Sequence, residues 1–201
     1  MSTIEVNTIK SISGTSTLTI GESGDTIALT SGAKTSGFGK IGQILQSSTT
    51  TTTSVTSTSY VDVGLSQAMT PSTTSSKILV IAFCSGGSAS SAGASGDDAF
   101  VALARDIGGA GYSNIGGGGN VASDAFIHWS AGNGSSQSYN DMQWSIQKGT
   151  FLYLDSPAST SECTYKLQQK NRNASKQTYF NRRGGDTLSS ISYLTLMEIL
   201  D

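Results

Sequence analysis

SKILVIAFC, residues 76–84, is the most apolar of a series of short strand-like runs that begins near Tyr60. The other runs in this series are TSYVDVGL (58–65), FVALARDI (100–107), VASDAFIHW (121–129), MQWSIQ (142–147), FLYLDSP (151–157), ECTYKLQQK (162–170), QTYFNR (177–182) and ISYLTLMEIL (191–200). About ten short strands at regular spacing, with turn residues between them, predict an antiparallel β-sandwich of the jelly-roll kind. FVALARDI also fits a short helix that begins at Asp97 or Asp98, but its context favours a strand.

The composition agrees with an all-β chain. Only 13% of the 201 residues are charged, and the chain has 24 glycines but 2 prolines. Disorder usually needs more charge or more proline, so we expect most of the chain to fold. Serine and threonine dominate the polar residues, and threonine suits the solvent face of a strand better than a helix. The length predicts one domain, or one domain with a short appendage.

The first forty residues form the predicted appendage. Short alternating runs, IEVNTIKSI (4–12), TLTIG (17–21) and DTIALTSG (25–32), are separated by glycine-containing turns. Strands this short bury too little to be stable alone, and identical chains around a threefold axis would supply the missing surface. We therefore predict an attachment arm or trimerisation stem over 1–40 and a head domain over 41–201. The apolar positions of the stem are Ile4, Val6, Leu18, Ile20, Ile27 and Leu29.

A threonine-rich stretch follows the predicted stem. The run SSTTTTTSVTSTS, residues 47–59, includes five consecutive threonines at 49–53. Two interpretations stay open, a flexible linker and an exposed edge strand, because β-branched threonine favours extended backbone.

Two glycine- and serine-rich stretches, Ser85–Gly96 and Gly108–Asn120, are predicted to be long surface loops, where recognition residues usually lie. Aromatic residues also flank the polar stretch SAGNGSSQS at 130–138. Aromatic rings beside amides and carboxylates are typical of surfaces that recognise carbohydrate or protein. The predicted receptor-binding residues are His128, Trp129, Tyr139, Asp141 and Trp144. A core position is the alternative for each tryptophan.

The sequence offers little to enzyme chemistry. His128 is the one histidine, and the nucleophile-elbow pattern GxSxG is absent. No cluster of histidine, cysteine and acidic residues has the spacing of metal ligands, so no metal is expected. Gly37, Gly39 and Gly42 match GxGxxG, with Asp62 further along, but no buried strand precedes them and no helix follows, so we expect no cofactor. A hydrolase would need two facing carboxylates, and nothing pairs the candidates Asp97, Asp98, Asp124, Asp141, Asp155 and Asp186.

Charge and apolar runs limit the partners. A formal net charge of -2 and a sequence pI near 5.3 argue against binding nucleic acid. Basic residues gather between Lys166 and Arg183, as a solvated cationic face or as partners in salt bridges between subunits. The start MSTIEVNTIK lacks the apolar core of a signal peptide, and the run Ile78–Cys84 is too short for a membrane helix. Cys84 and Cys163 lie in strand-like runs and are expected to be buried thiols.

Four stretches of the chain resemble tail-fibre-like structural proteins of marine tailed bacteriophages, including those of cyanobacteria. They are STIEVNTIKSISGTSTLTIGESGDTIALTSGA (2–33), TSTSYVDVGLSQAMTPSTTSSKILV (56–80), YLDSPASTSECTYKLQ (153–168) and SYLTLMEI (192–199). The segment 85–147 resembles them least, and no catalytic residue carries over.

The resemblance implies a homotrimeric virion protein that assembles in the host bacterial cytoplasm. It would attach to other tail or baseplate proteins through its N-terminal arm and contact a host-surface glycan or protein through its head. The alternatives are a capsid decoration or head-fibre protein and, from the enzyme class, a receptor-degrading hydrolase.

Overall fold

The computed structural model describes residues 41–89, 98–116, 125–130 and 144–200, and these residues contain strands but no helix. They belong to a compact unit that spans Gly39–Asp201. The strands are β1 (Ile41–Thr49), β2 (Thr53–Val55), β3 (Val61–Met69), β4 (Lys77–Ser88), β5 (Asp98–Ile107), β6 (Ser113–Ile115), β7 (Ala125–Ser130), β8 (Gln147–Asp155), β9 (Cys163–Asn171), β10 (Thr178–Phe180) and β11 (Ser192–Ile199).

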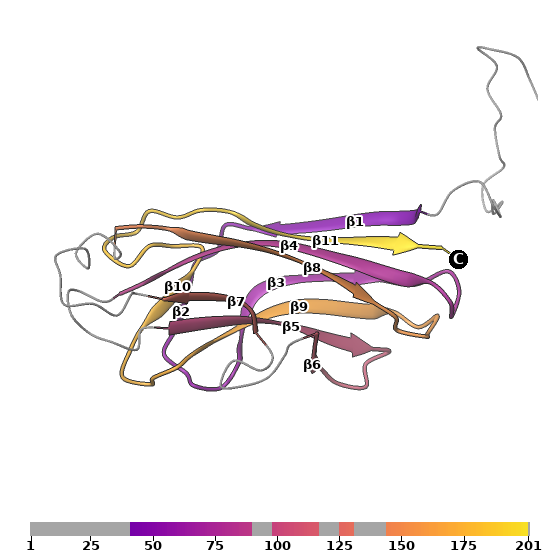
Figure 1. Ribbon diagram of the computed structural model, residues 1–201, viewed down its shortest axis with the longest axis horizontal. Coiled ribbons are helices and arrows are strands. Elements are labelled where there is room, and N and C mark those ends of the chain that lie inside the picture. The colour runs from indigo at the N-terminus through magenta and orange to yellow at the C-terminus, as the bar shows by residue number, and fades with distance from the viewer. Residues whose placement is uncertain (1–40, 90–97, 117–124, 131–143, 201) are drawn as a thin grey trace, which may run out of the picture. The chain divides into compact units, whose positions relative to one another are not determined.

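The strands form two antiparallel sheets that pack face to face (Figure 1). In the first sheet, sheet A, β4 is central and β8 pairs with one side of it to form an edge. The other side of β4 pairs with β11 and β10. These two strands pair in turn with β1 and β2, which form the opposite edge. In the second, sheet B, the order is β3, β9 and β5, with β6 and β7 both paired to the far side of β5. The predicted β-sandwich is therefore confirmed.

The core lies between the sheets and follows from alternation along the strands, which is clearest on β9, on β11 and on β4 up to Cys84. Successive side chains of a strand point to opposite faces, so every second residue enters the core. On β4 the inward residues are Ile78, Val80, Ala82 and Cys84, all 0% exposed. Both cysteines are free and buried, as predicted, and burial raises the pKa of the Cys84 thiol to about 12.

A buried polar cluster connects the two sheets through the core. Asp155 at the end of β8 in sheet A accepts hydrogen bonds from Arg105 of β5, at 2.7 Å, and from the Tyr165 hydroxyl of β9, at 2.6 Å. Burial, together with the hydrogen bond to Asp155, raises the pKa of Tyr165 far above its usual range. Because both partners of Asp155 belong to sheet B, this cluster fixes the sheets against each other.

Several finer predictions can be compared with the strands. FVALARDI is a strand, β5, rather than a helix. The threonine-rich stretch forms part of an edge of sheet A, because it contributes the end of β1 and all of β2. MQWSIQ, in contrast, is not a strand at Trp144–Ile146, and β8 begins only at Gln147.

The prediction of a surface loop over Ser85–Gly96 is wrong for its first four residues, which are buried and belong to β4. Glycine at 86 and 87 explains this difference, because a Cβ at Gly86 would lie 2.4 Å from the Trp129 ring and one at Gly87 would lie 2.8 Å from the Arg182 carbonyl. Within the other predicted loop, Gly108–Asn120, residues Ser113–Ile115 form β6.

The predicted stem positions Ile4, Val6, Leu18, Ile20, Ile27 and Leu29 lie outside the described residues. Among the residues that are described, no helix is long and apolar enough to cross a membrane.

Candidate recognition surface at one end of the sandwich

The two ends of the sandwich are formed by different strand ends (Figure 1). At one end, Ile41 at the start of β1 pairs with Ile199 at the end of β11, so residues 1–40 join the sandwich there. At the opposite end β4 stops at Ser88, β5 starts at Asp98, β7 stops at Ser130 and β8 starts at Gln147. The spans 90–97 and 131–143 are therefore both connected to this second end, which we call the loop end.

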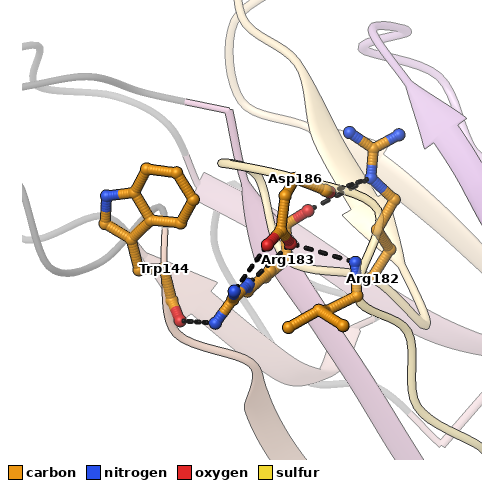
Figure 2. Close-up of polar contacts among 5 residues, drawn as sticks. Trp144, Arg182, Arg183 and Asp186 are labelled. Carbon is orange, nitrogen blue, oxygen red and sulfur yellow. Dashed lines mark hydrogen bonds and ion pairs between the residues drawn. The ribbon is translucent and has the colours of Figure 1, made fainter.

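Trp144 is an exposed aromatic residue at the loop end, with 47% of its surface accessible. The Arg183 guanidinium lies beside it, donating a 3.0 Å hydrogen bond to the main-chain carbonyl of Trp144 (Figure 2). The guanidinium carbon is 5.4 Å from the centroid of the indole ring, within the range of a cation–π contact. The core alternative for Trp144 is therefore wrong, and its ring faces solvent.

Arg183 is itself fixed by Asp186, three residues further along the chain. Its Nε and Nη2 atoms contact the two oxygens of that carboxylate at 2.7 Å and 2.5 Å, a two-point contact that sets the plane of the guanidinium (Figure 2). Hydrogen bonds from Arg183 and from the Leu188 backbone lower the pKa of Asp186 to about 2. The ion pair therefore persists across the physiological pH range.

Two glycines shape the turn beneath the tryptophan. The Trp144 ring lies against Gly185, where a Cβ would approach the ring to 2.6 Å. At Gly184 a Cβ would lie 1.7 Å from the Ser88 carbonyl oxygen, so this turn passes directly over the end of β4. Glycine at both positions allows the turn to support Trp144 from below.

Asn181 anchors the base of the same turn. It is fully buried and has a φ of 60°, a left-handed conformation that asparagine tolerates better than most residues. Its side chain donates to the Thr49 carbonyl at 2.8 Å and accepts from Ser85 at 3.1 Å. The turn from Arg182 to Ser190 is thus tied to both β1 and β4.

The prediction that Trp129 binds a receptor is wrong. Trp129 is 2% exposed and packs in the core against Gly86, so it offers almost no surface to a receptor. Its neighbour His128 points to the opposite face of sheet B, where it stacks on Phe100 with a centroid distance of 5.0 Å. Its Nε2 atom lies 3.2 Å from Oδ1 of Asp98. Tyr139 and Asp141 lie outside the described residues.

Three of the carboxylates weighed for hydrolysis are engaged in other contacts. Asp155 is buried with Arg105 and Tyr165, and Asp186 is paired with Arg183. Asp98 contacts Arg172 at 3.2 Å. The candidates Asp97, Asp124 and Asp141 lie outside the described residues. Over the described part of the chain, no group of three or more His, Cys, Asp or Glu residues is placed to hold a metal ion.

The basic residues of the C-terminal third do not form one cationic face. Lys166 lies 2.8 Å from Asp62 and over the Tyr112 ring, Lys170 lies over the Tyr60 ring, and Arg182 lies over the Tyr179 ring. Each of these positive charges is therefore engaged in its own local contact.

Sequence comparison finds no model of a known protein family that matches this chain, and no curated protein that matches it. The arrangement of Trp144, Arg183 and Asp186 was not predicted from the sequence, where Arg183 was treated as part of a basic group and no partner was found for Asp186. The usable signal was NRRGGD at 181–186, where two glycines stand between two arginines and an aspartate.

Proposed function

We propose that this chain is a subunit of a bacteriophage virion, a homotrimeric tail-fibre or adhesin protein whose loop end contacts the host surface. The observation that carries the proposal is the polarity of the sandwich. Residues 1–40 join it at one end, and the exposed Trp144 lies with Arg183 at the other. A fibre tip needs this division, because one end must be attached while the other remains free to bind.

The proposed fold of the head is a jelly roll, and the order of the strands supports it. The chain has eight strand positions if each of three strand pairs is counted as one position, namely β1 with β2, β6 with β7, and β10 with β11. These pair first with last, second with seventh, third with sixth and fourth with fifth. This is the pattern made by rolling up one long antiparallel hairpin, an architecture that is common in viral structural proteins and lectins.

The proposed ligand is a glycan or a protein of the host surface. A solvent-exposed indole ring offers a flat apolar face to a sugar ring or an apolar side chain, and tryptophan and arginine are enriched where binding energy concentrates. A single contact of this kind is weak, contributing about 1 to 2 kcal/mol. Three copies on one fibre would strengthen it through effective concentration.

Host adsorption of particles that carry Trp144→Ala tests the proposal. We expect adsorption to fall, while the melting temperature of the purified protein stays nearly unchanged because the ring is exposed. Tyr112→Ala is the matched control, since Tyr112 is 45% exposed but lies on the hairpin between β5 and β6. Equal adsorption by Trp144→Ala and wild-type particles would contradict the contact surface.

The position of the protein on the particle separates the fibre from a decoration role. A label on the chain should appear at the tail in electron micrographs, whereas a label spread over the shell would favour the capsid decoration or head-fibre alternative. Absence of the chain from purified particles would overturn the virion assignment itself.

A further inference from the structure

The outer face of sheet A is uncharged across its central rows and exposes several large apolar side chains, although an outer face of a sandwich normally meets water. Directly opposite residues of antiparallel strands share a face, so the strand registers define rows across the sheet. One row runs through all four strand positions as Ile44, Met197, Leu79 and Leu154. Both ends of this row are exposed, with Ile44 at 54% and Leu154 at 51%.

The two rows that follow combine large apolar side chains with polar side chains that carry no charge, among them Gln46, which donates a 2.8 Å hydrogen bond to Thr195. The first consists of Gln46, Thr195, Ile81 and Leu152, and the second of Ser48, Tyr193, Phe83 and Thr150. None of these side chains is charged, and Leu152 is 63% exposed. Charge returns only beyond the rows, at Lys77 and at Lys148. We call these three rows the apolar face.

The outer face of sheet B has the opposite character. There Lys166 lies 2.8 Å from Asp62, Gln168 donates to the same carboxylate at 2.8 Å, and His128 and Lys170 flank Phe100. This polar face is what a solvated sheet requires. The contrast between the two sheets indicates that sheet A is built to be covered and sheet B to meet water.

The apolar face is large enough to be the centre of an interface. Four strands about 4.8 Å apart and three rows about 6.8 Å apart give roughly 400 Å² in projection. Soluble monomers rarely expose contiguous apolar patches larger than a few hundred Å², and the largest patch on a monomer is often functional. A standard interface takes roughly 800 Å² from each partner, so we expect a polar rim around this centre.

We propose that copies of this chain associate through the apolar face, with the β8 side of one copy against the β1 side of the next. The absence of charge favours further copies of this chain as the occupants, because three such faces can meet around a threefold axis without burying an unpaired charge. A closed ring needs two different surfaces that fit each other, and the row from Ile44 to Leu154 ends in an exposed apolar side chain at both borders of the sheet. The inference rests on the proposed homotrimer and names the surface that forms it.

The mass of the full chain in solution, measured by light scattering, tests the surface. Wild-type protein should be a trimer, and Leu154→Glu and Ile44→Glu should each shift it toward monomer. Both side chains point away from the core, so circular dichroism should show a folded sandwich in each variant. Leu188→Glu is the matched control, because Leu188 is 56% exposed but lies at the loop end.

A cysteine pair tests the arrangement of the copies. Within one chain Ile44 and Leu154 lie on strands separated by two others, about 14 Å apart, which is too far for a disulfide. Under mild oxidation Ile44→Cys/Leu154→Cys should therefore give covalent dimers and trimers on a non-reducing gel. Wild-type protein should give none, because Cys84 and Cys163 are buried. Efficient dimers from Leu154→Cys alone would instead indicate two faces packed about a twofold axis and would overturn the ring.

The surface and the proposed function can fail separately. If Leu154→Glu stays trimeric while polar substitutions at Ile4 and Val6 dissociate the protein, residues 1–40 hold the trimer and the surface is wrong, although the virion role stands. If Leu154→Glu dissociates the protein but the chain is absent from purified particles, the surface stands and the virion role is wrong.

Discussion

Arg183 donates a 3.0 Å hydrogen bond to the main-chain carbonyl of Trp144, although the two residues are brought together only by the fold. Arg183→Ala should therefore release the segment before β8 without disturbing the core. We expect collisional quenching of tryptophan fluorescence by acrylamide to increase, because Trp144 would lose its neighbour while buried Trp129 stays protected. Host adsorption should fall in parallel.

Arg172→Ala is the control for this change, since Arg172 also pairs with an aspartate, Asp98, but at a different contact. The Trp144→Phe background identifies the source of the signal, because the remaining emission comes from Trp129 alone. An increase in quenching that persists in Trp144→Phe would show that Arg183 supports the core instead.

The adjacent glycines of the turn should respond differently to alanine. At Gly185 the three atoms nearest to the new methyl group all belong to the Trp144 ring, a side chain that can move, so Gly185→Ala should lower adsorption with little loss of stability. At Gly184 it meets the Ser88 backbone at 1.7 Å, so Gly184→Ala must displace the end of β4. We expect that variant to lose about 1 to 3 kcal/mol, the usual range for overpacking, in urea unfolding. Equal stability of the two variants would contradict this account of the turn.

The two tryptophans show how far the sequence could predict the site. In VASDAFIHW, period-two alternation places Ile127 and Trp129 on one face and His128 on the other, which is how β7 lies. The alternation does not say which face is inward. That depends on Gly86, which lies far away in the sequence and leaves room for the Trp129 ring.

The same limit applies to MQWSIQ, where Trp144 and Ile146 also alternate but no neighbouring strand pairs with them. The strands and the two-sheet sandwich could be predicted, because the alternation of apolar and polar residues is a signal within each strand. Burial of a given aromatic residue, and the pairing of Arg183 with Asp186 beneath Trp144, depend on contacts between distant segments. The apolar face of sheet A was missed for a related reason: a strand with apolar residues on both faces reads simply as a very apolar run, as SKILVIAFC does.

The hydrogen bond between Tyr165 and Asp155 should contribute measurably to stability. Tyr165→Phe removes a 2.6 Å bond to a buried carboxylate but keeps the ring, so we expect a loss of about 1 to 3 kcal/mol in the free energy of unfolding. Tyr153→Phe is the matched control, because that partly buried ring packs edge-on against Phe126 and should change stability by less than about 0.5 kcal/mol. Similar losses in both variants would show that the inter-sheet bond adds nothing.

Glu198 should make the stability of the sandwich depend on pH below about 4.5. Its carboxylate accepts hydrogen bonds from the Ser72 backbone at 2.5 Å and from Gln43 at 2.8 Å. Burial alone would raise its pKa, but these bonds outweigh burial and hold the pKa below the usual value of 4.5. Because the folded pKa is lower than the unfolded one, the stabilisation is present above the unfolded pKa and is lost as pH falls through the folded pKa.

Urea unfolding of wild type and Glu198→Gln from pH 7 to pH 3 measures this contribution. At pH 7 the variant should be less stable by about 1 to 3 kcal/mol, because it loses the charge of a buried acceptor. The difference should shrink on acidification, since protonation removes the same charge from the wild type. Glu162→Gln, a change at an exposed glutamate, should follow the wild-type curve throughout. A constant gap between wild type and Glu198→Gln would mean that packing around Gly42 and Ser72, rather than the carboxylate charge, explains the loss.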